Sequence, residues 1–256
     1  MRKRYIKIIK RGLFILITFI GSMLLYMIVN CSIENIKITA LTTEFMKKGV
    51  YQSEMSDSKN KYYKVPRETW MSTDDSYVIK NGRMTYGNSG DILLTTHSYA
   101  EDSAFLNDVI SIFFGGHCSS VCYDEAYKGK RYSNNYSIES HYYDNVQYVY
   151  SGFWDDENKK RDVMALRVKA SDEKKKEAFH NIADCIGKKY NKTFIFNTKD
   201  RYYCTDLISR AWEKVGIDLN YDGFYCSVQD IVCSDETYIS FYKVCKKDVN
   251  YYYYLG

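Results

Sequence analysis

The longest apolar stretch of the chain lies close to its N-terminus. Residues 12–30, GLFILITFIGSMLLYMIVN, contain no charged side chain. A run of about 20 such residues matches the hydrocarbon thickness of a bilayer, and it is longer than the ~7–15-residue apolar core of a cleaved signal peptide. The preceding residues 1–11, MRKRYIKIIKR, hold six basic side chains and no acidic one. Because positive clusters stay in the cytoplasm, we expect a single-pass anchor with the rest of the chain outside the cell.

The residues after this span bear on whether the anchor is cleaved. The sequence MIVNCSIEN lacks the small-residue pattern of a signal-peptidase site. Cys31 raises the alternative of a lipoprotein, but the bulky Asn30 before it fits a lipid-attachment site poorly. We therefore expect an uncleaved anchor in the cell membrane.

Beyond the span, the patterning divides the chain into two parts. Residues 31–85 are polar and irregular, so we expect a stalk that leads into a domain. Residues 86–256 carry regular apolar patterns and form the expected domain. Short or alternating apolar runs predict strands over residues 92–96, 117–125, 131–143, 146–154, 162–169 and 237–244, the last of which we expect to be the final strand.

Apolar residues at helical spacing predict three helices in this domain, over residues 103–114, 171–187 and 204–216. In the third, Leu207, Ile208, Ala211 and Trp212 share one face, and Gly216 can close the C-terminus. Helices combined with strands in this arrangement indicate an α+β fold, with helices packed on a mainly antiparallel sheet.

Composition narrows the possible partners. The net charge is only +4, and no long basic run lies outside the N-terminus, so nucleic-acid binding is not expected. The 27 tyrosines suit half-exposed strand positions. Apart from Cys31, which directly follows the span, seven cysteines lie farther along the chain, so disulfide pairing among them outside the cell would leave one thiol over. None of them has C-x-x-C spacing, and we expect no metal site.

Cys204 is the residue with the clearest chemical signal. It stands where the helix over residues 204–216 begins, and unpaired N–H groups and the helix dipole favour a thiolate there. The alternative is that Cys204 is a small buried hydrophobic residue, which is the commoner role of cysteine. A catalytic role also requires a base and a group that orients the base.

His117 is the best candidate for the base among four histidines. It follows a Gly-Gly turn at the start of a predicted strand, and Glu139 on the next strand could accept a hydrogen bond from its far ring nitrogen. A hydrogen-bonded structural histidine and a solvent-facing glutamate are the alternatives. His180 lies on the polar side of its helix, where we expect it to be solvated, and His97 and His141 have ordinary loop or strand-end settings.

Five motifs in this order resemble the permuted branch of the NlpC/P60 superfamily of papain-like cysteine hydrolases, specifically the YiiX/YebB-like group. They are GDILL, GGHCSSVCYD, SIES, IGKKYNKTFIF and YYCTDLISRAW, and the resemblance covers roughly residues 86–245. It implies a permuted papain-like fold with Cys204 as nucleophile, His117 as base and Glu139 as orienting group. Thr205 and Asp206 stand where the family commonly has serine and glutamate, and Cys118 stands where it usually has an apolar residue.

The chemistry expected from this set is thiolate attack on an amide or ester carbonyl, with the oxyanion held by the Cys204 backbone N–H and a nearby donor. Tyr202 and Tyr203 are candidates for that donor, although either could simply pack. No cofactor is expected. Three functions stay open: an amidase or endopeptidase acting on peptidoglycan or other envelope peptides, a lipid or acyl-chain hydrolase or acyltransferase, and a non-catalytic envelope-binding module.

Overall fold

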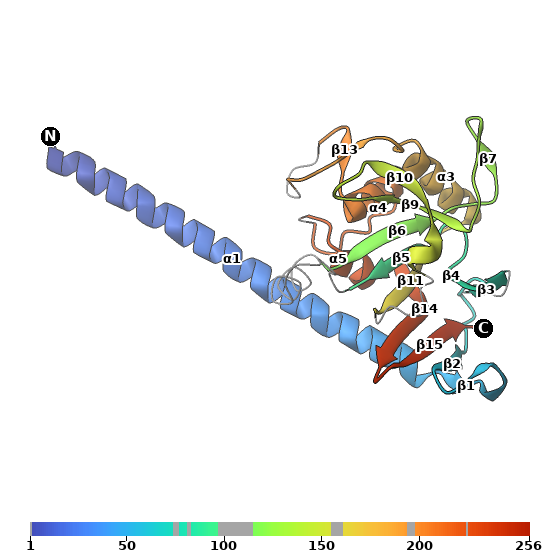
Figure 1. Cartoon of the computed structure of the whole chain (residues 1–256). Helices are drawn as coiled ribbons and strands as arrows, with labels where there is room; N and C mark the ends of the chain where they lie inside the picture. Colours follow the sequence, from blue (N-terminus) through green and yellow to red (C-terminus); the bar gives the residue numbers. More distant parts are fainter. Residues whose placement is uncertain are drawn as a thin grey trace.

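The fold consists of one long helix and a mixed α+β domain (Figure 1). The computed structural model describes residues 2–73, 77–80, 83–96, 115–154, 161–193, 198–223 and 225–256. The helices are α1 (Arg2–Lys47), α3 (Asp172–Ala183), α4 (Cys204–Glu213) and α5 (Val228–Cys233), with 3-10 turns at Ser53–Met55 and Ser151–Phe153. The helix predicted over residues 103–114, and His97, lie outside the described residues.

One sheet of nine strands organises the domain, in the order β1-β2-β15-β14-β11-β5-β6-β9-β10. Neighbouring strands are antiparallel except β2 and β15, which run parallel. These strands are β1 (Val50–Tyr51), β2 (Asn60–Val65), β5 (Ile92–Thr95), β6 (His117–Val121), β9 (Tyr136–Ser140), β10 (Val146–Tyr150), β11 (Val163–Val168), β14 (Thr237–Lys246) and β15 (Val249–Leu255). The α+β prediction is confirmed.

Three two-stranded ribbons complete the described strands. They are β3 (Tyr77–Lys80) with β4 (Arg83–Tyr86), β7 (Ala126–Tyr127) with β8 (Lys130–Arg131), and the parallel pair β12 (Lys189–Tyr190) with β13 (Arg201–Tyr202). The β12–β13 pair leads directly into α4, so it fixes where that helix starts.

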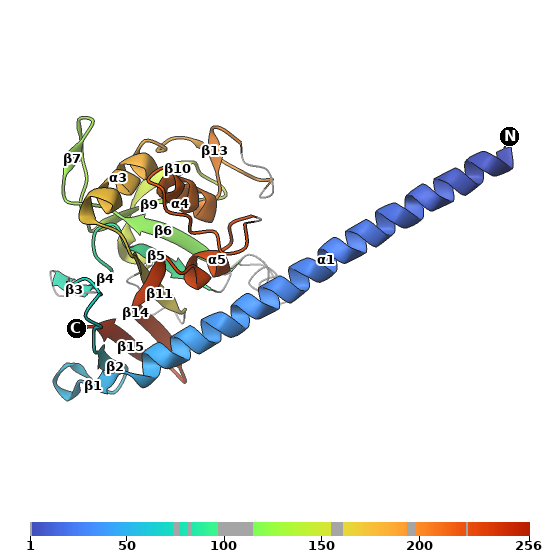
Figure 2. The ribbon, with the colours of Figure 1, turned by 180° about the vertical axis from the view of Figure 1, so that it is seen from behind.

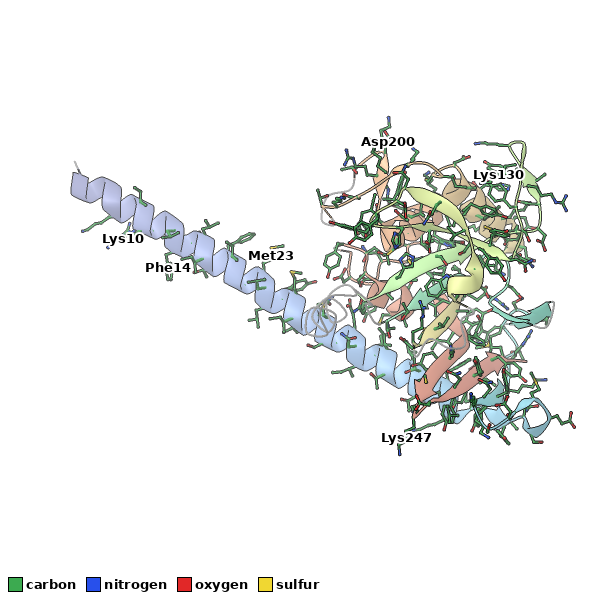
Figure 3. The ribbon with its side chains drawn as sticks, viewed as in Figure 1. Lys10, Phe14, Met23, Lys130, Asp200 and Lys247 are labelled. Carbon is green, nitrogen blue, oxygen red and sulfur yellow. The ribbon has the colours of Figure 1, made fainter. Side chains whose placement is uncertain are left out.

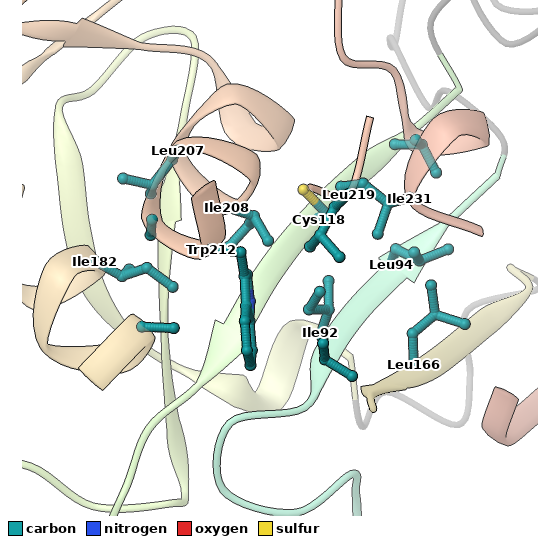
Figure 4. Close-up of a cluster of buried hydrophobic side chains, with 14 of the residues drawn as sticks. Ile92, Leu94, Cys118, Leu166, Ile182, Leu207, Ile208, Trp212, Leu219 and Ile231 are labelled. Atoms are coloured by element: carbon teal, nitrogen blue, oxygen red, sulfur yellow. The ribbon is translucent and has the colours of Figure 1, made fainter. Parts of the chain in front are cut away.

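The central strands are buried on both faces. In β5, Ile92 and Leu94 belong to the core beneath the helices, whereas Leu93 between them belongs to a second cluster. Side chains alternate across a strand, so the two clusters fill opposite faces of the sheet. Figure 4 shows the first cluster, where Ile208 and Trp212 of α4 meet Ile92 and the other side chains of β5 and β6.

Helix α4 forms where the sequence predicts it. Leu207, Ile208, Ala211 and Trp212 are all buried, and they pack on β6 and β9. Gly216, which has a φ of 78°, lies in the turn that follows the helix, in the left-handed region that glycine adopts without strain. Apolar periodicity therefore sets both the extent of α4 and the face that it buries.

The segment expected to be an irregular stalk is instead ordered. Helix α1 runs without a break from Arg2 to Lys47, and residues 60–65 form β2 inside the main sheet. The expectation failed because the polar residues in this part share their helix with an apolar stripe: Cys31, Ile38 and Phe45 are buried against the domain. The polar character of the segment belongs to its outer face.

The strand over residues 237–244 is not the last one. The tyrosine-rich end of the chain forms β15, which pairs with both β14 and β2. Within it Tyr252 and Tyr254 are buried, while Tyr251 and Tyr253 are partly exposed on the other face. The sequence does not predict this strand, because four consecutive tyrosines hide the alternation of apolar and polar residues that a strand normally shows.

The N-terminal half of α1 stands clear of the domain. Figures 1 and 2 show this half projecting from the domain, while its C-terminal half runs beside α5 and β14. Apolar side chains such as Phe14 point outward from the projecting part (Figure 3). Within the described residues, α1 is the one helix long and apolar enough to cross a membrane, and a signal sequence would meet the same test.

Candidate active site

Cys204 is the first residue of α4, and buried hydrogen bonds hold the start of this helix in place. Ser140 of β9 donates to the carbonyl of Tyr202 at 2.6 Å, just before the helix. Thr205 donates to the carbonyl of Cys226 at 2.6 Å, just after its first residue. Tyr203 occupies the N-cap without a capping side-chain bond. The position of the Cys204 sulfur therefore depends on β9 and on the segment leading to α5.

His117 and Glu139 come from adjacent antiparallel strands. Ser120 of β6 pairs with Ile138 of β9, so the same register places Glu139 diagonally from His117 on one face of the sheet. The Nε2 atom of His117 lies 2.8 Å from Oε2 of Glu139. Both residues are partly or fully shielded from solvent. The pairing that the sequence analysis predicted between them is present.

The ring of His117 also shares a hydrogen bond with the Cys204 thiol. Since Nε2 faces Glu139, Nδ1 is the nitrogen that meets the sulfur. The three side chains therefore form a continuous chain of hydrogen bonds from the helix start to the sheet. Glu139 fixes the orientation of the ring, which is the role that a third group plays beside a cysteine and its base.

The electrostatics of the group favour a charged cysteine. Hydrogen bonding from Cys118 lowers the pKa of Cys204 well below its ordinary value, against the effect of burial, and His117 adds to this by its hydrogen bond and charge. Burial acts to lower the pKa of His117, but the bonds to Cys204 and Glu139 outweigh it and raise that pKa to about 10. At neutral pH these shifts favour a thiolate–imidazolium pair.

Glu139 stays ionised despite its burial. Burial acts to raise its pKa, but the hydrogen bond and charge of His117 lower it overall. Gln147, which stands directly opposite Glu139 in β10, donates to its Oε1 at 3.3 Å. A negative Glu139 therefore faces a positive ring across a short hydrogen bond.

Three residues that the sequence analysis did not propose complete the surroundings. Gln147 supports Glu139, the buried ring of Trp154 stacks on His117 with centroids 5.9 Å apart and planes at 2°, and Cys118 bonds to Cys204 through its thiol and backbone N–H. Pairing the segments SIES and VQYVY as a hairpin could have indicated Gln147. No local sequence pattern indicates that Trp154 stacks on His117.

The two tyrosines proposed as oxyanion donors have other partners. The hydroxyl of Tyr202 lies 3.4 Å from the carbonyl of Lys199 and also bonds to Cys185. The hydroxyl of Tyr203 bonds to the backbone of Cys226. Their role as oxyanion donors stays a prediction.

The remaining described histidines have separate settings. His141 lies edge-on to His117, with ring centroids 6.2 Å apart. His180 is not simply solvated as expected, because it bonds to Glu125 at 2.6 Å and stacks on Tyr127 with centroids 3.9 Å apart. The Glu125–His180 pair thus repeats the His–Glu contact on a different part of the domain, without a cysteine.

One group of carboxylates among the described residues is close enough to hold a metal ion. Oxygen atoms of Glu34, Asp222 and Asp230 lie within 4.8 Å of one another at the contact between α1 and α5. The amide of Asn30 already donates to Glu34 at 2.8 Å and to Asp222 at 2.9 Å. This group is separate from the Cys204 site, which lies where α4 meets β6.

Comparison with known proteins identifies the family of the chain. The sequence profile of the peptidase family C92, described as permuted papain-like amidase enzymes of the YaeF/YiiX type, matches residues 86–232, more than half of the chain. A crystal structure of metalloprotein YiiX from Escherichia coli O157:H7 is similar, with 15% sequence identity, a TM-score of 0.43 and coverage of 62% of this chain and 97% of that one. No curated protein matches. By its sequence, this chain belongs to the YaeF/YiiX family of permuted papain-like amidases, a family of cysteine hydrolases.

Proposed function

We propose that the protein is a membrane-anchored thiol hydrolase that cleaves amide bonds of cell-envelope peptides, peptidoglycan peptides above all, through Cys204, His117 and Glu139. The observation that carries this proposal is the continuous hydrogen-bonded chain of these side chains at the start of α4. An amidase family acts on peptide or acylated substrates in general. The choice of an envelope substrate is supported by the N-terminal pattern, which predicts a catalytic domain outside the cell.

The mechanism follows from the ionic state of the site. The Cys204 thiolate attacks the carbonyl carbon, and the oxygen of the tetrahedral intermediate is stabilised by the Cys204 backbone N–H and a second donor. His117 gives its proton to the leaving amine, which leaves a thioester. The neutral ring then takes a proton from water, the hydroxide attacks the thioester, and the acid product departs as Cys204 regains its charge. Glu139 keeps the ring oriented through both steps.

Thiol labelling tests the activated cysteine without knowledge of the substrate. All eight cysteines lie within the described residues, and Cys245 is the only one besides Cys204 that is not buried. We expect iodoacetamide to label Cys204 much faster than Cys245 in the full chain in detergent at neutral pH, because the thiolate is the reactive form. Equal labelling of the two, measured by peptide mass spectrometry, would contradict the proposal.

Product analysis then identifies the substrate class. The full chain is incubated with purified peptidoglycan fragments and, separately, with acylated lipids, and new products are identified by mass spectrometry. Cleavage of wall peptides that disappears in Cys204→Ala is the expected result. Product from neither substrate, with Cys204 labelled no faster than Cys245, would favour a binding module.

A lipid or acyl-chain hydrolase is the second candidate, and one observation favours it. The part of α1 that follows residues 12–30 packs against the domain instead of leaving it on a flexible stalk. If residues 12–30 cross the membrane, the domain is then held close to the lipid surface. Release of fatty acid or lysolipid, with intact wall peptides, would select this function.

A further inference from the structure

The nucleophile proposed here has a second thiol beside it. Cys118 is the residue after His117 in β6, and its thiol and backbone N–H both bond to the Cys204 sulfur. Figure 4 shows Cys118 within the core cluster, near Ile208 of α4. Cys204 is only partly buried, whereas Cys118 is fully buried. Small oxidants therefore reach Cys204 first, and Cys118 contacts the Cys204 sulfur from the buried side.

We propose that Cys118 is a resolving thiol: after a peroxide oxidises Cys204, Cys118 forms a disulfide with it, which switches the enzyme off reversibly and protects the nucleophile from irreversible oxidation. This inference rests on the proposed role of Cys204 as an activated thiolate. It adds a modification site to the active site and gives Cys118 a function beyond its hydrogen bond to the Cys204 sulfur.

The two steps balance with the peroxide as the only oxidant. The Cys204 thiolate attacks one oxygen of hydrogen peroxide, the O–O bond breaks, and the products are a sulfenic acid and hydroxide. The Cys118 sulfur then attacks the Cys204 sulfur, the S–O bond breaks, and the oxygen leaves as water with the proton from Cys118. A dithiol reductant reduces the Cys118–Cys204 disulfide back to two thiols.

The charges of the site suit this order of events. The pKa of Cys204 is lowered, so it is the thiol that reacts with peroxide, while burial and the neighbouring Cys204 raise the pKa of Cys118 well above its ordinary value. Oxidation converts the Cys204 thiolate into a neutral sulfenic acid. The negative charge of Cys204, one of the causes that oppose ionisation of Cys118 beside its burial, then disappears, so Cys118 becomes more reactive once Cys204 has been oxidised.

Cys226 is the competing thiol that the test must separate from Cys118. It is buried, and its charged form would interact with both Cys118 and Cys204. Its thiol, however, bonds to Ser209 on α4, whereas the thiol of Cys118 bonds to Cys204 directly. We therefore expect the bridge to form with Cys118.

The test treats the full chain in detergent with hydrogen peroxide, followed by peptide mass spectrometry and iodoacetamide labelling of Cys204 before oxidation, after it, and after dithiothreitol. In the wild type we expect a peptide linked through Cys118 and Cys204, loss of Cys204 labelling, and recovery of most of it on reduction. In Cys118→Ser we expect sulfinic acid at Cys204 and no recovery, because nothing intercepts the sulfenic acid. Cys118→Ala gives a second variant should the serine disturb folding.

Cys122→Ser is the matched control, since Cys122 is also buried and lies just after β6. The pKa of Cys122 is raised by burial and affected by Lys130 and Asp124, with no contribution from Cys204. This variant should behave like the wild type. Sulfinic acid at Cys204 in the wild type as fast as in Cys118→Ser, or a bridge to Cys226, would overturn the inference while the proposed hydrolase stands. Slow labelling of Cys204 before any oxidation would contradict the hydrolase itself, and the inference with it.

Discussion

The carboxylate of Glu139, on the sheet, affects the reactivity of Cys204 at the start of α4 through the ring of His117. It bonds to one nitrogen of His117, and the same ring bonds to Cys204 through the other. A hydrogen bond to a charged group contributes about 1.5–3 kcal/mol, and each 1.4 kcal/mol corresponds to a factor of ten. The negative charge of Glu139 therefore stabilises the imidazolium, and through it the thiolate.

This coupling predicts a specific pH dependence. Labelling of Cys204 rises with pH through its lowered pKa, so in the wild type we expect it to reach a plateau at neutral pH. In Glu139→Gln the imidazolium loses its ionic partner, so the onset should move to higher pH and labelling at neutral pH should fall by about 10–100-fold. The rate of iodoacetamide labelling, measured over a pH series, checks this.

The matched control is Glu125→Gln. Glu125 bonds to His180 at 2.6 Å, so this variant breaks a second His–Glu pair that has no cysteine. Its labelling profile should follow the wild type. An equal shift in both variants would show that the effect comes from overall charge or stability, and not from the contact with His117.

Single residues were predicted unevenly from the sequence. Cys204, His117 and Glu139 each carry a local signal, namely a helix start, a strand start and an acid in the neighbouring predicted strand, and the structure brings them together. Gln147 and Trp154 carry no such signal, because their contacts depend on how β10 pairs with β9 and on where the chain returns after it.

At the level of elements, hydrogen bonds to other segments hold the start of α4, whose N-cap residue makes no side-chain capping bond. Thr205 in the first turn donates to the carbonyl of Cys226 at 2.6 Å in a buried setting. The segment that leads into α5 therefore contributes to placing the nucleophile. Loss of this bond should affect stability and the geometry of the site together.

We expect Thr205→Val to lower the free energy of unfolding by about 1–3 kcal/mol, because the carbonyl of Cys226 is then buried without this donor. Thr39→Val is the control: the Thr39 hydroxyl bonds to Asn35 on the exposed side of α1, and its loss should change stability by less than about 0.5 kcal/mol. Urea unfolding of the full chain in detergent measures both. Equal losses would contradict the role assigned to Thr205.

Elements with a clear period were predicted well, and those without one were not. The stripes of α3 and α4 and the apolar strands β5 and β11 appear at the expected places. β15 was not predicted because its tyrosines occupy both faces, and β2 was not predicted because the residues of β15 that it pairs with lie 190 positions away along the chain. Pairing over such separations leaves no local trace in the sequence.

On the scale of the whole molecule, α1 belongs to the domain as well as to the predicted anchor. Ile38 and Phe45 are buried in the main core, and Lys37 donates to the carbonyl of Cys233 at 2.7 Å. Lys37 also lies over the ring of Tyr221, 4.1 Å from its centroid. Apolar and polar contacts thus join this half of α1 to α5 and its neighbours.

Two alanine substitutions on α1 test this attachment. Ile38 is 8% exposed and Ile36 is 70% exposed, only two residues apart on the same helix. We expect Ile38→Ala to cost about 2–4 kcal/mol of stability through the cavity it leaves, and Ile36→Ala to cost less than about 0.5 kcal/mol. Urea unfolding followed by tryptophan fluorescence compares them, and similar effects would mean that α1 does not pack on the domain.

Because α1 is one unbroken helix, it restricts the distance from the membrane at which substrate bonds can be cleaved. At about 1.5 Å per residue, residues 31–47 rise for roughly 25 Å alongside the domain. With residues 12–30 in a bilayer, the enzyme would work at a fixed height, in a layer no deeper than the domain itself. Its substrates would have to come to that layer, because α1 continues as one helix from residues 12–30 to the part that packs on the domain.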